Sequence, residues 1–375
     1  MTADLQVQAY ETETVLYMAM ELSDKQWRLA FGDGTRQRQV VIAAGEVAAL
    51  VEQIDKAKAK WDLPPDTALV SCYEAGRDGF WLHRQLAELG IANRVVDAAS
   101  IEVSRRARRA KTDRLDARAL LEKPMRYEGG ERGVWRLVRV PDPVWEDRRQ
   151  LERERGQLLG ERNRHRNRLI GKLVAQGIRL LIDKDFVARL EEVELFDGSA
   201  LPVHLKAGLI REFERLQAVN AQLRAVEQEI GALVESEEEL HAVRTLMLLS
   251  GVGPVGAWVL VLEILGWREM ANRRQLASLA GLVPAPYNSG GMVRDQGISK
   301  AGNRRVRALL IQLAWLWLRY QPTSKHSLWF QERFGGGSKR QRRIGIVALA
   351  RRLLIDLWRF VETGAVPEGA RLKVA

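Results

Sequence analysis

The stretch TVLYMAMELSDKQWRLAFGDGTRQRQVVI, residues 14–42, decides the fold class of the first part of this chain. Apolar runs alternate with short polar breaks, and FGDG is typical of a turn, so the stretch predicts three short strands. Helices and apolar strands then alternate, with helices predicted at 46–63 and 78–90 and strands at 67–75 and 93–98. Hairpins followed by this alternation indicate a mixed sheet covered by helices, an α/β domain over residues 1–140.

The middle of the chain, residues 141–240, predicts two long helices behind a connector at 123–145 that is rich in Gly, Pro and charge. The first helix is strongly basic, and the second shows apolar spacings of three and four that predict a coiled coil. The predicted seam residues are Leu209, Phe213, Leu216, Asn220, Leu223, Ile230 and Leu233. A polar seam residue fixes register at a cost in stability. We expect pairing between subunits, and a helical hairpin within one chain is the alternative.

Residues 241–375 predict a third, mainly α-helical domain. Within it, residues 243–264 form the pattern apolar helix, Gly-Val-Gly-Pro turn, apolar helix, which resembles a helix-hairpin-helix motif. The amides of Gly251 and Gly253 could bind a phosphate there, because glycine lets a backbone approach closely. A loop then leads to a helix that begins near Asn303, and the chain ends in an amphipathic basic helix.

The net charge of +11 is unevenly distributed along the chain. Residues 101–170 hold 20 Lys and Arg against 12 Asp and Glu, and residues 301–360 hold 13 against 2. The two blocks together carry +19, so the rest of the chain is acidic by 8. Two concentrated basic surfaces favour a polyanionic partner, with nucleic acid as the leading candidate.

Composition argues against several other classes of protein. Cys72 is the single cysteine, so no disulfide can form within the chain, and the five histidines show no zinc-ligand spacing with it. No basic segment precedes the apolar stretch near the N-terminus, and no run reaches the roughly 18 apolar residues of a membrane span. We therefore expect a cytoplasmic protein with no membrane partner.

Two glutamates stand where α/β proteins collect ligands. Glu21 ends the first predicted strand and Glu74 ends a buried one. Carboxyl ends of strands in such sheets are the usual place of ligand binding. We therefore expect the two carboxylates to meet.

Two aspartates in KTDRLDARAL, residues 111–120, extend this acidic group. Asp113 and Asp116 are neighbours on one helical face, although like charges at that spacing destabilise a helix by a few tenths of a kcal/mol. Four converging acids repel unless cations lie between them, so we expect one or two Mg²⁺ ions, which act on phosphoryl oxygens. The alternative for the aspartates alone is pairing with Lys111 and Arg114 on an exposed helix.

Ser289, in PYNSGG, is the second candidate for chemistry. It lies on a predicted loop that a substrate could reshape, but a serine is a weak nucleophile unless a base or metal activates it. Taken alone, this serine is more typical of a turn. Cations near both candidate sites are spaced to hold phosphates. The candidate nucleic-acid-binding residues are Arg105, Arg106, Arg108, Arg109, Arg294, Lys300, Arg304 and Arg307.

Seven features occur in order along the chain: ELSDKQW, YEAG, KTDRLDARAL, a basic coiled coil, LLSGVGPVGAW, LAGLVPAPYNSGG and ISKAGNRRVRALL. This set resembles the transposases of insertion-sequence family one-ten, most closely subgroup eleven-eleven, through nearly the whole chain. The resemblance implies a RuvC-like, ribonuclease-H-type domain and a C-terminal transposase domain. It assigns the metal-binding catalytic tetrad to Glu21, Glu74, Asp113 and Asp116, and the nucleophile to Ser289.

The resemblance also implies a function, RNA-guided DNA recombination that excises and inserts a mobile element. In such proteins the metal-bound acids help to activate a serine, which attacks DNA and forms a covalent phosphoserine link. A bridge or seeker RNA encoded by the element selects donor and target DNA by base pairing. We expect a dimer that assembles to a tetramer through the coiled coil, in a prokaryotic cytoplasm and at the nucleoid when active.

Two assignments have rivals in the sequence. The family pattern usually has Asp at the first acidic position, where this chain has Glu21, and Asp24 is a possible substitute. Ser299, in ISKAG, is a rival nucleophile, although the SGG context favours Ser289.

Two other functions fit the same residues. A metal-dependent junction nuclease would hydrolyse DNA with water, and a catalytically inactive scaffold would bind nucleic acid only. More than 170 residues separate Asp116 from Ser289. We expect the acids and the serine to meet between subunits.

Overall fold

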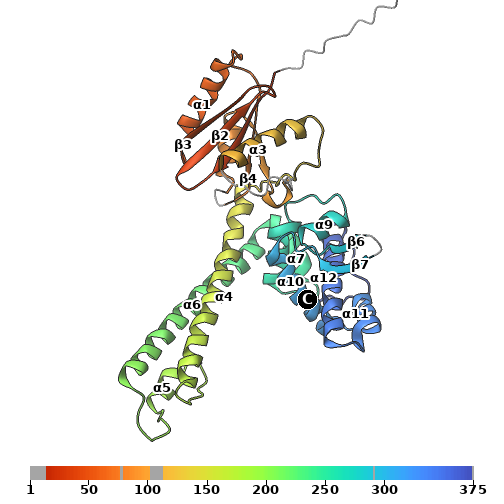
Figure 1. Ribbon diagram of the computed structural model, residues 1–375. Helices are drawn as coiled ribbons and strands as arrows, with labels where there is room; N and C mark the ends of the chain where they lie inside the picture. Colours follow the sequence, from red (N-terminus) through yellow and green to blue (C-terminus); the bar gives the residue numbers. More distant parts are fainter. Residues whose placement is uncertain (1–13, 77–78, 102–112, 290–291, 374–375) are drawn as a thin grey trace, which may run out of the picture. The chain divides into compact units, whose positions relative to one another are not determined.

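The computed structural model describes residues 14–76, 79–101, 113–289 and 292–373. The chain divides into two compact units, Met1–Val140 and Pro141–Ala375 (Figure 1). A further boundary at residue 240 remains a prediction.

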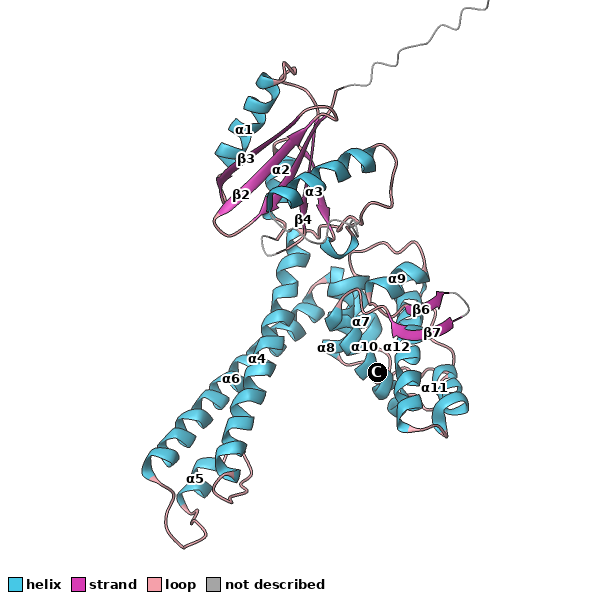
Figure 2. Cartoon of the chain, in the orientation of Figure 1, coloured by secondary structure: helices cyan, strands magenta, loops and turns pink. Residues whose placement is uncertain are grey.

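The first unit is built on a five-stranded mixed sheet (Figure 2). Its strands are β1 (Leu16–Leu22), β2 (Gln26–Gly32), β3 (Gln37–Ala43), β4 (Leu69–Glu74) and β5 (Ala92–Val96). The order is β3-β2-β1-β4-β5, in which β1, β2 and β3 pair antiparallel and β4 pairs parallel with β1 and with β5. The predicted mixed sheet is confirmed, and its topology is consistent with a ribonuclease-H-like fold.

Helices pack on both faces of this sheet. On one face, α1 (Val47–Lys60) and α2 (Trp81–Glu88) cover a core that contains Trp27 and Phe31. On the other face, α3 (Asp113–Glu128) packs over small side chains, Ala19, Ala30 and Cys72, which let the helix approach closely. The helix continues through Pro124 to Glu128, so the connector predicted from residue 123 begins later than expected.

A long helical hairpin begins the second unit. Its arms, α4 (Pro143–Val174) and α6 (Val203–Ser236), lie side by side, and the short α5 (Phe186–Glu191) packs at one end (Figure 1). Arg148 near the start of α4 bonds Glu237 just after α6, whereas His165 further along α4 bonds Glu212 near the start of α6. The arms are therefore antiparallel.

The apolar face of α6 is used within the chain. Leu209, Phe213, Leu216 and Leu223 are buried, as predicted for the seam. The prediction for Asn220 is wrong for the α4–α6 contact, because Val219 is buried there and Asn220 is only half-buried. Further along, Val226 and Val234 are buried and Leu233 is partly buried.

Glu212 is a buried polar residue of this seam. It is 5% exposed and accepts hydrogen bonds from His165, Arg168 and Arg215. Burial raises the pKa of Glu212, but the hydrogen bonds and charges of His165 and Arg168 outweigh this effect and hold the pKa below its usual value. A buried charge with several partners favours one register over its neighbours.

The rest of the second unit is mainly helical. Its elements are α7 (His241–Met247), α8 (Pro254–Leu260), a π-helical turn (Val261–Leu265), α9 (Arg273–Leu279), β6 (Pro284–Ser289), β7 (Met292–Ile298), α10 (Arg304–Tyr320), α11 (Lys325–Phe330), a second π-helical turn (Gln331–Gly335) and α12 (Lys339–Thr363). One core joins these helices to the nearby half of the hairpin through Leu158, Val226 and Ile230. The predicted loop around PYNSGG is a two-stranded hairpin, β6–β7.

Gly302 fixes the turn that leads from β7 into α10. Its φ is 145°, and a Cβ there would lie 2.4 Å from the carbonyl oxygen of Leu279. Gly302→Ala is expected to cost about 3 kcal/mol or more, because the backbone of α9 must move. Gly364→Ala is the matched control, since Gly364 also has positive φ (71°) but open space around it, and should cost about 1–2 kcal/mol. Urea unfolding of the full chain measures both, and equal losses would contradict this role of Gly302.

Candidate active site

Glu21 and Glu74 lie at neighbouring positions on the two central parallel strands. The last registered pair of β1 and β4 is Met20 with Tyr73, and the two glutamates are the next residues on each strand. Adjacent strands are about 4.8 Å apart, so the two glutamates lie side by side at the carboxyl end of the sheet. Glu21 is half-buried and Glu74 is exposed.

Both glutamates belong to the face of the sheet that α3 covers. Side chains alternate along a strand, and Ala19 and Cys72, two residues before Glu21 and Glu74, pack in the core beneath α3. Burial and the charge of Glu74 raise the pKa of the Cys72 thiol. Cys72 is therefore a packing residue and not a nucleophile.

The direction of α3 is fixed by contacts near its C-terminal end. Glu128, the last residue of α3, lies close to Tyr17 near the start of β1. Burial and the charge of Glu128 together raise the pKa of Tyr17. A Cβ on Gly32, the residue opposite Tyr17, would lie 2.8 Å from Met125. The last turns of α3 therefore lie over the beginning of β1.

The first turn of α3 is consequently directed toward the carboxyl end of β1, where the two glutamates lie. Asp113 and Asp116 belong to this turn. Their side chains lie outside the part that the structure describes, so the meeting of four carboxylates remains a prediction. Within the described part, His, Cys, Asp and Glu form no group of three that could hold a metal, and of the four acids only the side chains of Glu21 and Glu74 belong to that part. Paired carboxylates nonetheless suit Mg²⁺, which prefers oxygen ligands.

Asp24, the rival for the first acid, stands in the turn between β1 and β2. It is exposed and lies beyond the end of β1, whereas Glu21 is the position in line with Glu74. The register thus favours Glu21.

Ser289 stands at the tip of the β6–β7 hairpin, where it pairs with Met292 across the turn. Its side chain lies outside the described part. Ser299, the rival nucleophile, is at the base of the hairpin, and its amide donates to the carbonyl of Val283 (2.8 Å). A residue at the tip of a hairpin can reach the acidic site more readily than a residue at its base, which favours Ser289 over Ser299 as the nucleophile.

The candidate nucleic-acid-binding residues fall into three groups. Arg105, Arg106, Arg108 and Arg109 lie within residues 102–112, and the side chain of Arg294 lies within 291–295, all outside the described part. Lys300 and Arg304 are exposed at the turn into α10, where Lys300 has φ 56°. Arg307 is half-buried, and its Nη1 donates to the carbonyl of Ala280 (3.2 Å), which ties α10 to the end of α9.

The pattern of helix, glycine turn and helix at residues 243–264, which resembles a helix-hairpin-helix motif, is present as α7, a turn, α8 and the π-helical turn after it. Gly251 in the turn has φ 90°, and a Cβ there would lie 3.1 Å from Cβ of Tyr320. Close packing on α10 therefore already accounts for this glycine. Phosphate binding at the turn remains a prediction.

A buried charged cluster joins α4 to the C-terminal helices and was not anticipated from the sequence. Glu263, only 5% exposed, accepts hydrogen bonds from Arg149 (3.1 Å) and from the side-chain amide of Asn303 (2.7 Å). Asn303 also caps α10 by accepting from the amides of Arg305 and Val306. The N-cap Asn303 in AGNRR was the sequence signal for this cluster, but its partner Glu263 is 40 residues away in the sequence.

Glu152 extends this cluster, and burial raises its pKa to about 6 against the opposing charges of Arg155 and Arg305. The folded state thus holds this proton more tightly than the unfolded chain, whose value is near 4.5. The resulting stability is present at acid pH and is lost as the pH rises from about 4.5 to about 6.

Glu152→Gln is therefore expected to raise the free energy of unfolding at pH 8 and to leave it nearly unchanged at pH 4. Urea unfolding at the two pH values measures this. The exposed neighbour Glu154 supplies the control, because Glu154→Gln should show no such difference. A Glu152→Gln protein that is less stable than wild type at pH 8 would contradict the assignment.

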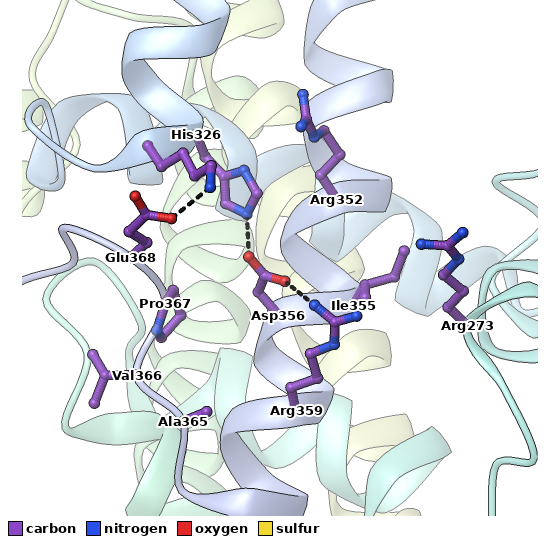
Figure 3. A pocket seen from close by; sticks show the side chains of 11 residues that line it. Arg273, His326, Arg352, Ile355, Asp356, Arg359, Ala365, Val366, Pro367 and Glu368 are labelled. Carbon is purple, nitrogen blue, oxygen red and sulfur yellow. Dashed lines mark hydrogen bonds and ion pairs between the residues drawn. The ribbon is translucent and has the colours of Figure 1, made fainter.

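A second unanticipated feature is a pocket of about 440 Å³ between α11, α12 and the C-terminal segment (Figure 3). His326, 6% exposed, shares a hydrogen bond of 2.7 Å between Nε2 and the Asp356 carboxylate. This bond holds the pKa of Asp356 below its usual value. Arg273, Arg352 and Arg359 line the same pocket, so its overall character is basic.

Comparison with known proteins places the chain among transposases. Residues 243–328 match the model of the transposase IS116/IS110/IS902 family. The chain is 43% identical to the putative transposase y4rJ of Sinorhizobium fredii, over 96% of this chain and 94% of that protein. It is 29% identical to a probable family 20 transposase of Pseudomonas aeruginosa, over 79% and 84%. It is 28% identical to the transposase of IS1111A from Coxiella burnetii, over 59% of each.

Helices long and apolar enough to cross a membrane do not occur among the residues that the structure describes.

Proposed function

Because the chain belongs to the IS116/IS110/IS902 family of transposases, enzymes that cut and rejoin DNA, we propose that it is an RNA-guided DNA recombinase with a serine nucleophile. The observation that carries the proposal is the register of β1 and β4. It brings Glu21 beside Glu74 on the face toward which the first turn of α3 is directed. An acidic site of this kind suits chemistry on phosphodiesters.

The chain's own residues have defined tasks in this proposal. Glu21, Glu74, Asp113 and Asp116 would hold one or two Mg²⁺ ions, which when bound polarise the phosphoryl oxygens of DNA. Ser289 gives its hydroxyl proton to a carboxylate, forms an ester bond to phosphorus, and a deoxyribose oxygen leaves with a proton. A different DNA end can reverse this step, so strands are exchanged without net hydrolysis.

Partners follow from the same proposal. Donor and target DNA and a guide RNA from the element would bind the basic surfaces, and RNA would select the DNA by base pairing. Assembly to a dimer and a tetramer also belongs to the proposal. Since the apolar face of α6 packs against α4 within the chain, pairing between subunits has to use other faces of the hairpin.

The test is strand cleavage by Ser289→Ala beside Ser299→Ala. Wild type should cleave element-end DNA in the presence of its RNA and Mg²⁺ and yield a protein–DNA adduct on a denaturing gel. Ser289→Ala should lose both, and Ser299→Ala should keep both. Cleavage that survives in Ser289→Ala would instead indicate a nuclease that uses water. No cleavage by wild type under any condition would indicate a binding scaffold.

A further inference from the structure

We infer that a groove at the base of the β6–β7 hairpin is a binding site for single-stranded DNA. The groove has a volume of about 880 Å³ and lies between α9, the hairpin, α11 and α12. The identity of the ligand as DNA rests on the proposed function, in which Ser289 attacks DNA.

Charge is the first argument for this site. Among the residues that the structure describes, seven cations and no acidic side chain line the groove. These cations are Arg273, Arg274, Lys300, Arg340, Arg343, Arg351 and Arg352. None of the seven forms an ion pair with any residue of the described part. Asp356 lies near enough to Arg352 to interact with its charge, but the seven cations together leave the groove strongly positive, which favours a polyanionic ligand.

The apolar floor distinguishes a single strand from a duplex. Ile298, Ile344, Val347 and Ile355 line the groove together with Trp329. Ile344 is 54% exposed, so its side chain is accessible to a ligand in the groove. A duplex would offer this floor only phosphates and sugars, whereas a single strand offers unstacked bases to apolar and aromatic side chains and phosphates to the cationic rim.

The length of the groove also fits single-stranded DNA. Arg340, Ile344, Val347, Arg351 and Ile355 recur at spacings of three and four, so they share one face of α12. The fifteen helical steps from Arg340 to Ile355 extend over roughly 22 Å. This length accommodates several nucleotides, in keeping with the roughly four or more nucleotides held by single-strand sites.

The position of the groove connects it to the proposed nucleophile. Pro284, Gln296, Gly297 and Ile298 belong to the base of the hairpin whose tip carries Ser289. The groove also shares three lining residues, Arg273, Arg352 and Ile355, with the pocket of Figure 3. Single-stranded DNA bound in this groove would therefore run along α12 and lead toward Ser289.

A thiol-protection experiment on the full chain tests the site. Cys72 is fully buried, so Ile344→Cys introduces the reactive thiol of the groove, and Leu328→Cys, at a position 58% exposed outside it, is the matched control. Both are made with Ser289→Ala, so that no covalent chemistry is needed. The probe is a maleimide, offered with a single-stranded DNA oligonucleotide, the same sequence as RNA, or a duplex.

Single-stranded DNA at about ten times its Kd should slow labelling at position 344 about tenfold, because only about a tenth of the protein remains free. Labelling at position 328 should not change. Equal labelling rates with and without DNA would overturn the site. Stronger protection by RNA would overturn the choice of DNA, and stronger protection by duplex would overturn the choice of a single strand. None of these outcomes depends on Ser289, so this inference and the proposed function fail separately.

A charge variant provides the second measurement. Arg343→Gln with Arg351→Gln removes two rim cations, and Arg319→Gln with Arg333→Gln removes two exposed cations outside the groove. The first pair should lower the salt dependence of single-strand binding, the slope of log K against log salt, by about 1.4. The control pair should leave the slope unchanged. An equal effect of the two pairs would contradict a localised site.

Discussion

Glu21→Gln is expected to lose RNA-dependent strand cleavage by about 10²–10³-fold, while Asp24→Asn keeps it. The register of β1 and β4 puts Glu21, and not Asp24, in line with Glu74 at the carboxyl end of the sheet. Gln has the size of Glu but no charge, so the variant keeps packing and loses attraction for a divalent ion. Cleavage of labelled element-end DNA at saturating Mg²⁺ is the measurement.

Two controls make this result specific. Glu74→Gln should match Glu21→Gln, because the two side chains start from adjacent positions. DNA and RNA affinity, measured by fluorescence anisotropy, should remain within a few-fold of wild type in both variants, since carboxylates do not hold phosphate. Full activity of Glu21→Gln with loss of activity in Asp24→Asn would show that the first acid comes from the turn.

Mixing two inactive proteins is expected to restore activity. Ser289→Ala keeps the acids, and Asp113→Ala keeps the serine. If each site takes its acids from one subunit and its serine from the other, a hybrid dimer has one complete site and one inactive site. With random exchange, half of the dimers are hybrids, and the mixture should reach about a quarter of wild-type cleavage. The measurement is cleavage by each protein alone and by their mixture after exchange of subunits.

Incomplete exchange is controlled by tagging the two single variants differently. Recovery of both proteins through one tag shows that hybrid dimers have formed. If hybrids form but the two single variants do not complement each other, the acids and the serine meet within one subunit.

Much of the first unit could be predicted because its signals are local. Turn residues around FGDG and the apolar runs beside them specify β1, β2 and β3 without reference to the rest of the chain. Local signals also gave the wrong position for the end of α3. Pro124 and the glycines after it are local signs of a connector, yet packing of Met125 against Gly32 keeps the helix intact to Glu128.

The seam of α6 shows where periodicity is insufficient. Counting from Leu216 by four selects Asn220, and counting by three selects Val219, and both satisfy the pattern. The structure buries Val219 because α4 supplies the facing surface, which the sequence of α6 cannot specify. Glu212 lacked any apolar signal, and only its contacts with His165 and Arg168 explain its burial.

The candidate site was predictable in part. Glu21 and Glu74 were found as strand ends, and parallel pairing of those strands was needed to make them neighbours. The groove beside the hairpin was not found, because its cations come from α9, the turn before α10 and α12. The spacing of Arg340, Ile344, Val347 and Arg351 on one helical face was a signal in the sequence for one of its walls.

The most direct measurement is mass spectrometry of the protein–DNA adduct after digestion with protease and nuclease. We expect a nucleotide attached through phosphate to the peptide that contains Ser289, formed with Mg²⁺ and absent from Glu74→Gln. Cleaved DNA with free phosphate ends and no modified peptide, or a nucleotide on another residue, would contradict it.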